Sequence, residues 1–277
     1  MDLVVKVGDP CCHGGGGAGP RPDVGSPGRS VTAFAAAMAA LFVASAAITI
    51  GWCASMAAMP GMSMPGGWTM SMAWMRMPEQ TWPGAAASFL GMWTVMMVAM
   101  MVPSLAPVLW RHRLALGDGG DRRVAAHSLL VAAGYFLVWS AQGALLFPLG
   151  VAVAAATMRW PLLARAVPPG VAIVVLGAGV LQVTPWKARH LACCRRLPRP
   201  KRDAPSAWQQ GLRLGLHCSA CCAGLTAVLL VVGVMDLAVM AAVTVAITAE
   251  RLAGVRIARA IGAILLAAGL FVLVRAI

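Results

Sequence analysis

Apolar residues follow one another along most of this chain in runs long enough to cross a lipid bilayer. A hydrocarbon layer about 30 Å thick needs about 20 helical residues. Short segments rich in Lys, Arg, Gly or Pro separate the runs. The pattern predicts an all-α fold, a polytopic transmembrane helical bundle of about seven spans, at 31–52, 84–110, 125–148 (with a break at Pro148 before a continuation to Ala156), 170–186, the stretch 211–236, 237–249 and 255–277.

The segments outside these runs suggest how the chain is organised. Residues 1–30 contain four consecutive glycines and several prolines, so we expect a disordered tail, which carries Cys11, Cys12 and His13. Residues 31–277 are expected to form one helical membrane domain. Within it, 53–83 is predicted to be a Met-rich loop, 157–169 a short loop and 187–206 a basic loop.

Composition supports a membrane protein and gives it an orientation. The chain is 60% hydrophobic and only 11% charged, whereas soluble domains are about one quarter charged. The net charge of +13 comes from Lys and Arg placed between apolar runs, which argues against nucleic-acid binding. A cytoplasmic N-terminus leaves only Arg76, Arg159, Arg165 and Arg275 of the 22 basic residues outside. The Met-rich loop is then external and the loop 187–206 cytoplasmic.

The stretch 211–236 contains the densest candidate chemistry. Helical periodicity places Cys218 over Cys221 and Cys222, and His217 over Cys221. A lone Cys is often only a small buried hydrophobe. Four soft donors within six residues, at a depth near the middle of the bilayer, instead favour a ligand or redox role. Thiolate and imidazole suit Cu(I), with Zn(II) as the alternative.

Methionines form two further groups of soft donors. Eight of them lie among Gly, Pro and Trp in the external loop, where a packed helix is not expected: Met56, Met59, Met62, Met64, Met70, Met72, Met75 and Met77. They predict a loop that captures Cu(I), and the alternative is an interfacial loop lying on lipid headgroups. In the span 84–110, Met96 stacks over Met100 and Met97 over Met101, either as ligands or as adaptable packing.

The remaining candidates lie in or beside the short span 237–249 and in the basic loop 187–206. Met235 and Met240 are candidate ligands. Asp236 is either a helix cap or a metal or proton group. Glu250 beside Arg251 predicts an interfacial ion pair. The adjacent Cys193 and Cys194 are expected to be thiols that face the cytosol.

This order of donors predicts a function. Thioethers outside, thiols and an imidazole within the bilayer and paired thiols inside form a slope of rising Cu(I) affinity. We therefore expect Cu(I) uptake, or delivery to a copper enzyme or a metallochaperone. One alternative is a membrane thiol–disulfide oxidoreductase that uses Cys218 and Cys221; another is a non-transporting, metallochaperone-like assembly subunit. The sequence contains no phosphate loop, and an enzyme is not the favoured reading.

Two motifs carry a resemblance to a known family. One is Trp-Thr-Val-Met-Met-Val-Ala-Met-Met-Val-Pro at 93–103, and the other is Gly-Leu-Arg-Leu-Gly-Leu-His-Cys-Ser-Ala-Cys-Cys at 211–222. The chain resembles, over about 84–255, the bacterial family of predicted metal-binding integral membrane proteins whose domain is catalogued as of unknown function. His217 and Asp236 depart from the residues expected there. The resemblance implies a metal-binding, multi-pass protein of the bacterial cytoplasmic membrane and does not choose copper over zinc.

Overall fold

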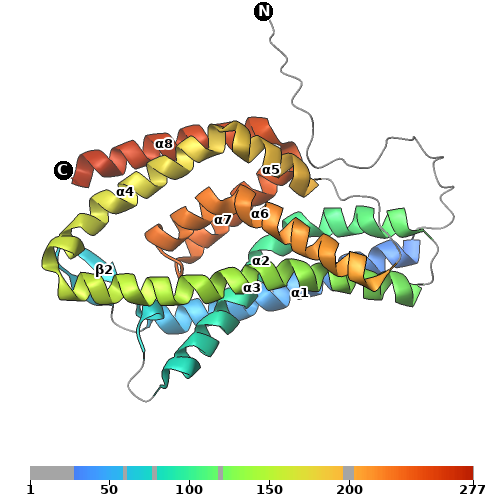
Figure 1. The fold of residues 1–277 in the computed structure, drawn as a ribbon, viewed down its shortest axis with the longest axis horizontal. Coiled ribbons are helices and arrows are strands. Elements are labelled where there is room, and N and C mark those ends of the chain that lie inside the picture. The colour runs from blue at the N-terminus through green and yellow to red at the C-terminus, as the bar shows by residue number, and fades with distance from the viewer. Residues whose placement is uncertain (1–27, 59–60, 77–79, 118–120, 196–202, 277) are drawn as a thin grey trace, which may run out of the picture.

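The fold, a computed structural model, is a bundle of long α-helices with one small β-hairpin (Figure 1). The structure describes residues 28–276 except 59–60, 77–79, 118–120 and 196–202. Within these residues the chain forms eight α-helices, two strands and a short 3-10 helix: α1 (Gly28–Ala57), β1 (Met62–Met64), β2 (Trp68–Met70), η1 (Met72–Trp74), α2 (Trp82–Leu116), α3 (Asp121–Arg159), α4 (Pro161–Val183), α5 (Pro185–Arg195), α6 (Ala204–Val232), α7 (Leu237–Ala253) and α8 (Val255–Ala276).

The predicted all-α membrane fold is confirmed. Six of the described helices are long and apolar enough to cross a membrane: α1, α2, α3, α4, α6 and α8. Helix α7 has 17 residues, which is at the lower limit of a spanning helix. The seventh span therefore stays a prediction, as does the orientation of the N-terminus. Residues 1–27 of the predicted tail, with Cys11, Cys12 and His13, lie outside the described residues, and residues 28–30 belong to α1.

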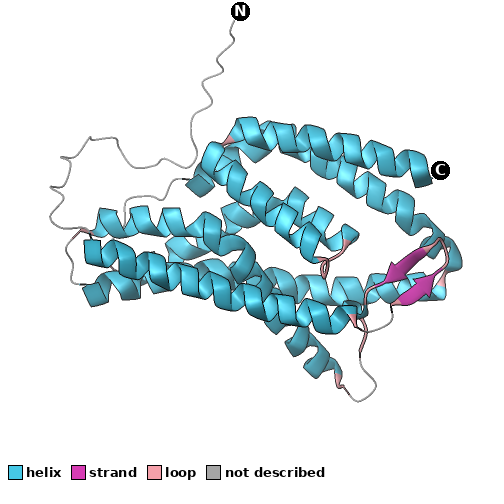
Figure 2. Ribbon diagram, turned by 180° about the vertical axis from the view of Figure 1, so that it is seen from behind, coloured by secondary structure: helices cyan, strands magenta, loops and turns pink. Residues whose placement is uncertain are grey.

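The helices pack mainly in three pairs, α1 with α2, α3 with α6, and α4 with α8. Figures 1 and 2 show the hairpin and the C-terminus toward one end of the molecule, and the last turn of α2 and the first turn of α3 toward the other. Large buried side chains of α2, α3, α6 and α7 form one core, which includes Trp93, Tyr135 and Trp139. The Trp93 indole donates a hydrogen bond to the Trp139 carbonyl at 2.9 Å, so α2 and α3 are joined within this core.

Two segments predicted to be loops are largely helical. Helix α3 runs to Arg159 and α4 begins at Pro161, so the expected loop 157–169 is reduced to a single break. The expected basic loop 187–206 begins with α5, which starts at Pro185. Proline is favoured in the first turn of a helix because its missing N–H has no helical partner there. Pro161 therefore starts a helix inside the predicted loop 157–169, and Pro185 starts one just before the predicted basic loop 187–206.

The Met-rich segment also contains regular structure. Residues 53–57 continue α1, and β1 and β2 form an antiparallel hairpin in which Met62 pairs with Met70 and Met64 with Trp68. Because alternate strand residues share a face, these four side chains lie on one face of the hairpin. The Trp68 indole donates to the carbonyl of Ala164 at 2.9 Å. This hydrogen bond holds the hairpin against the first turn of α4.

Candidate metal centre

Three cysteines of α6 form the centre of the candidate site. The sulfur atoms of Cys218, Cys221 and Cys222 all lie within 4.8 Å of one another and are placed to hold a metal ion. Cys222 Sγ is 3.9 Å from Cys218 Sγ and 3.7 Å from Cys221 Sγ. All three side chains are buried, with at most 2% of their surface exposed. The predicted stacking of Cys218 over the other two thiols is therefore what the structure shows.

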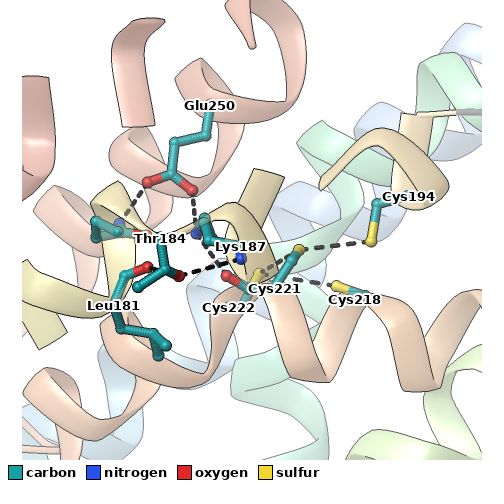
Figure 3. Close-up of polar contacts among 9 residues, drawn as sticks. Leu181, Thr184, Lys187, Cys194, Cys218, Cys221, Cys222 and Glu250 are labelled. Atoms are coloured by element: carbon teal, nitrogen blue, oxygen red, sulfur yellow. Dashed lines mark hydrogen bonds and ion pairs between the residues drawn. The ribbon is translucent and has the colours of Figure 1, made fainter. Parts of the chain in front are cut away.

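A fourth thiol joins this cluster from a different helix. Cys194 of α5 is fully buried, and its sulfur lies 3.4 Å from Cys221 Sγ (Figure 3). We expected Cys193 and Cys194 to be thiols that face the cytosol; Cys194 is buried and Cys193 is in a disulfide, so the prediction was wrong for both. Cys194 is buried because α5 is a helix whose buried residues Lys187, Leu191 and Cys194 share one face at helical spacing.

Burial keeps the Cys194 thiol protonated before any metal binds. Desolvation raises its pKa well above the usual value, and hydrogen bonds to the thiols of Cys218 and Cys221 raise it further. The hydroxyl of Tyr135, on α3, lies 3.0 Å from Cys218 Sγ and is also fully buried. The site therefore combines sulfur donors from α5 and α6 with a phenol from α3.

A buried ion pair borders the thiols. Lys187 Nζ lies 2.6 Å from Glu250 Oε2, and both side chains are 1% exposed. The same ammonium group donates to the carbonyl of Cys221 at 2.5 Å (Figure 3). The Gln182 amide donates to Glu250 Oε1 at 2.5 Å. The predicted interfacial pair between Glu250 and Arg251 is wrong, because adjacent helical residues point in different directions while α5 brings Lys187 to Glu250.

Arg251 is a second buried cation near the thiols. It lies in the last turn of α7 and is 5% exposed. Its Nη1 donates to the Ser104 hydroxyl of α2 at 3.0 Å, whereas Nε and Nη2 have no hydrogen-bond partner among the described residues. Its surroundings include Cys218 and Tyr135, with which it interacts electrostatically. The sequence analysis did not identify Arg251 as a site residue, because Arg251 was expected to pair with Glu250.

His217 faces a second imidazole at the edge of the cluster. Its Nδ1 lies 3.3 Å from Nδ1 of His190, which α5 supplies. Desolvation lowers the pKa of His190, and the neighbouring His217 lowers it further. His190 is thus neutral near pH 7, the form in which imidazole binds metals. His190 was not predicted, although it lies in the same basic helix as Cys194.

The candidate methionines of the spans lie in the same core as the thiols. Met96, Met97, Met100, Met101 and Met240 are each at most 5% exposed and belong to one buried cluster that also contains Cys53 and the four cysteines of the candidate site. Met235 is partly buried and packs against this cluster. The methionines of the second predicted span and the cysteines of the fifth are therefore both buried in one core inside the bundle. Whether any of these thioethers binds metal stays a prediction.

Three methionines of the Met-rich segment belong to a separate cluster. Met64 and Met70 are buried beside Ala154 of α3 and Ala164 of α4, with Met75 and Trp68 packed against them. Met62 shares their hairpin face and is 40% exposed, and Met56 is half-buried at the end of α1. Met59 and Met77, and the side chain of Met72, lie outside the part of the chain that the structure describes. The Met-rich segment is thus a folded hairpin whose thioethers gather on one face.

Asp236 acts as a helix cap. Its carboxylate accepts hydrogen bonds from the backbone N–H groups of Ala238 and Val239 at 2.8 and 3.0 Å. These are two of the first amides of α7, which have no partner inside the helix. Of the two roles predicted for Asp236, the cap is the one that the structure shows.

Comparison with known proteins adds a family. A family model described as PpoB2, copper chaperone, matches residues 90–272. The matched segment contains the second-span methionines, all four clustered cysteines and the Lys187–Glu250 pair, and it begins after the Met-rich hairpin. The match supports a copper-related family. The two sequence motifs implied a metal-binding family without specifying the metal. No curated protein and no solved structure was found to match the chain.

Proposed function

Because the chain belongs to the PpoB2 copper chaperone family, we propose that it binds Cu(I) at the thiols of α5 and α6 and delivers it to a copper enzyme or to another metallochaperone. The observation that carries the proposal is the buried group of Cys218, Cys221 and Cys222. The family description and the apolar helices support copper handling in a membrane; the oxidation state, the ligands and the delivery step are our inference.

The spacing of the sulfur atoms suits a single bound ion. Metal–sulfur bonds are about 2.3 Å long, so two thiolates on one ion lie about 3.8 Å apart in tetrahedral geometry and about 4.0 Å apart in trigonal geometry. The sulfur atoms of Cys222 and its two neighbours are 3.7 and 3.9 Å apart. Cys194 Sγ lies 3.4 Å from Cys221 Sγ. Small side-chain adjustments are then sufficient to place an ion among them.

The ligand types favour Cu(I) over Zn(II). Thioethers are soft, uncharged donors that bind Cu(I) and bind zinc poorly. Two methionine clusters accompany the thiols, one on α2 and one on the hairpin face of Met62, Met64 and Met70. We propose that the hairpin receives the ion on the external side and that the methionines of α2 pass it to the thiols. This route places the N-terminus and α5 on the cytoplasmic side of the bacterial membrane.

A thiol–disulfide oxidoreductase is the less favoured function. Disulfide exchange requires a thiolate that a second thiol or disulfide can reach. Cys218 has no exposed surface, and Cys221 and Cys222 are 2% and 1% exposed. The same burial is compatible with a metal that is transferred through neighbouring donors. A non-transporting assembly subunit and an uptake protein both remain compatible with the ligand set.

The proposal is tested with the full-length protein purified in detergent. Replacing Cys218 and Cys221 with Ser should abolish stoichiometric Cu(I) binding, measured by competition with a chromogenic Cu(I) chelator, because serine oxygen is a poor ligand for a soft ion. Cys53→Ser is the matched control, since Cys53 is a buried thiol of α1 outside the three-cysteine group. Cu(I) binding that survives the double substitution would refute the proposal.

Two further measurements define the role. Zn(II) titrated in parallel should bind less tightly than Cu(I), and preferred Zn(II) binding would contradict the assignment of the metal. Copper uptake into sealed vesicles then separates transport from delivery. Uptake that depends on Cys218 and Cys221 favours a transporter, whereas transfer of Cu(I) to an added acceptor without uptake favours a chaperone.

A further inference from the structure

Arg251 is a buried cation that forms no ion pair with any residue that the structure describes. The guanidinium has five N–H groups and stays protonated at any physiological pH. One nitrogen, Nη1, donates to the uncharged hydroxyl of Ser104, and Nε and Nη2 have no partner among the described residues. A charge taken out of water costs several kcal/mol unless an opposite charge compensates it. The buried charge of Arg251 therefore lowers the stability of the metal-free protein.

The nearby carboxylate does not neutralise it. Glu250 already pairs with Lys187 at 2.6 Å and accepts a further hydrogen bond from Gln182. This pair carries no net charge, so the positive charge of Arg251 is left over. Among the described residues, the Lys187–Glu250 contact is the ion pair that the structure shows, and it does not include Arg251.

The groups around Arg251 are those of the candidate metal centre. The hydroxyl of Ser104, on α2, accepts a hydrogen bond from it. The phenol of Tyr135 on α3, the thiol of Cys194 on α5 and the thiols of Cys218 and Cys222 on α6 lie near enough to interact with its charge. The cysteines among these neighbours bring negative charge when they bind a metal, because a thiol loses its proton to become a ligand.

We propose that Arg251 is the built-in counter-cation of a copper–thiolate complex with one net negative charge. One Cu(I) ion displaces two thiol protons and forms two Cu–S bonds; the protons pass to the solvent, and no electron is transferred. Two thiolates and one Cu(I) leave a charge of minus one, which the guanidinium cancels. The inference rests on the proposed copper binding at the cysteines and adds a residue that belongs to no predicted ligand set.

The charge balance restricts which complexes the site accepts. A cluster of two Cu(I) ions on three thiolates, or three on four, also carries one negative charge and is compatible with Arg251. Zn(II) on four thiolates carries two negative charges, of which one stays uncompensated in a buried site. The single cation thus favours a monovalent ion over a zinc site that uses all four cysteines.

The test compares Arg251→Gln and Arg251→Lys in the full-length protein in detergent. Loss of the charge should weaken Cu(I) binding about tenfold to a hundredfold, the range typical of groups that support metal ligands from outside the coordination shell. The number of protons released per Cu(I) should fall from two to one, because the neutral site then stabilises one thiolate and one thiol. Arg251→Lys should restore both values. Arg256→Gln, at an exposed position of α8, is the control and should behave as wild type.

A purely structural role predicts a different result. If Arg251 only holds α7 against α2, then Arg251→Gln should destabilise the metal-free protein without changing the proton count. Our proposal predicts a metal-free variant at least as stable as wild type, because an uncompensated buried charge has been removed. Unchanged affinity and proton release in Arg251→Gln would overturn the inference. Failure of the wild-type protein to bind Cu(I) would instead overturn the proposed function.

Discussion

Substituting Gly211 by Ala should separate α6 from α3 and disturb the metal centre. A Cβ atom at Gly211 would lie 2.3 Å from the carbonyl oxygen of Val131 and 3.1 Å from Cα of Gly134. Ordinary contacts between heavy atoms are about 3.5 Å, so α6 has to move by about 1 Å. Overpacking of this kind costs about 1–3 kcal/mol. Glycine is thus required here for the close approach of two membrane helices.

The displacement should also reach the thiols. Cys218 follows Gly211 by seven residues, about two helical turns, and lies on the same side of α6. Its sulfur is 3.0 Å from the hydroxyl of Tyr135, which α3 carries. A shift of about 1 Å at Gly211 therefore lengthens this contact and should weaken Cu(I) binding together with stability.

The assay is unfolding in mixed micelles, with Cu(I) affinity measured on the same preparations. Gly91→Ala on α2 is the matched control, because a Cβ atom there has nothing within 4 Å. Alanine in place of an unconstrained helical glycine stabilises a helix by up to about 1 kcal/mol. The reasoning would be refuted if Gly211→Ala were as stable as Gly91→Ala and bound Cu(I) with wild-type affinity.

Two further predictions concern stability and use the same unfolding assay. Lys187→Met should destabilise the protein by about 3–5 kcal/mol, because it leaves the Glu250 carboxylate buried without a cation. Adding Glu250→Leu should recover most of that loss, and a double variant as unstable as the single one would contradict this account. Asp236→Ala should cost about 1 kcal/mol through the loss of the α7 cap, whereas Asp236→Asn keeps the acceptor; equal stability of wild type and Asp236→Ala would contradict the cap.

The central sulfur cluster was predictable because its geometry is local. Cys218, Cys221 and Cys222 belong to one helix, and the 3.6-residue period alone places their sulfur atoms together. The same period stacks Met96 over Met100. The apolar runs were equally informative about fold class, since a bilayer-length segment satisfies its backbone hydrogen bonds as a helix. Helix ends were less accurate, because proline starts a helix at Pro161 and Pro185 as readily as it ends one.

Contacts between helices could not be predicted from the sequence, because they depend on how the helices pack together. Cys194 and Lys187 looked like members of a solvated basic loop, and α5 instead buries both beside α6 and α7. Glu250 and Arg251 looked like partners because they are adjacent in sequence. In the fold each one faces a different helix, Glu250 toward α5 and Arg251 toward α2.

The sequence by itself determined that this is a helical membrane protein with side chains that are soft metal donors. Segment length, hydropathy and helical spacing are local properties, so each can be read from one segment without knowing how the segments pack. Only the tertiary structure decided which charges and thiols meet at the donors, because that depends on how closely the helices approach one another. Gly211 and Gly215 permit such an approach between α6 and α3. The fourth thiol beside the three cysteines of α6, and the guanidinium that forms no ion pair among the described residues, are results of that assembly.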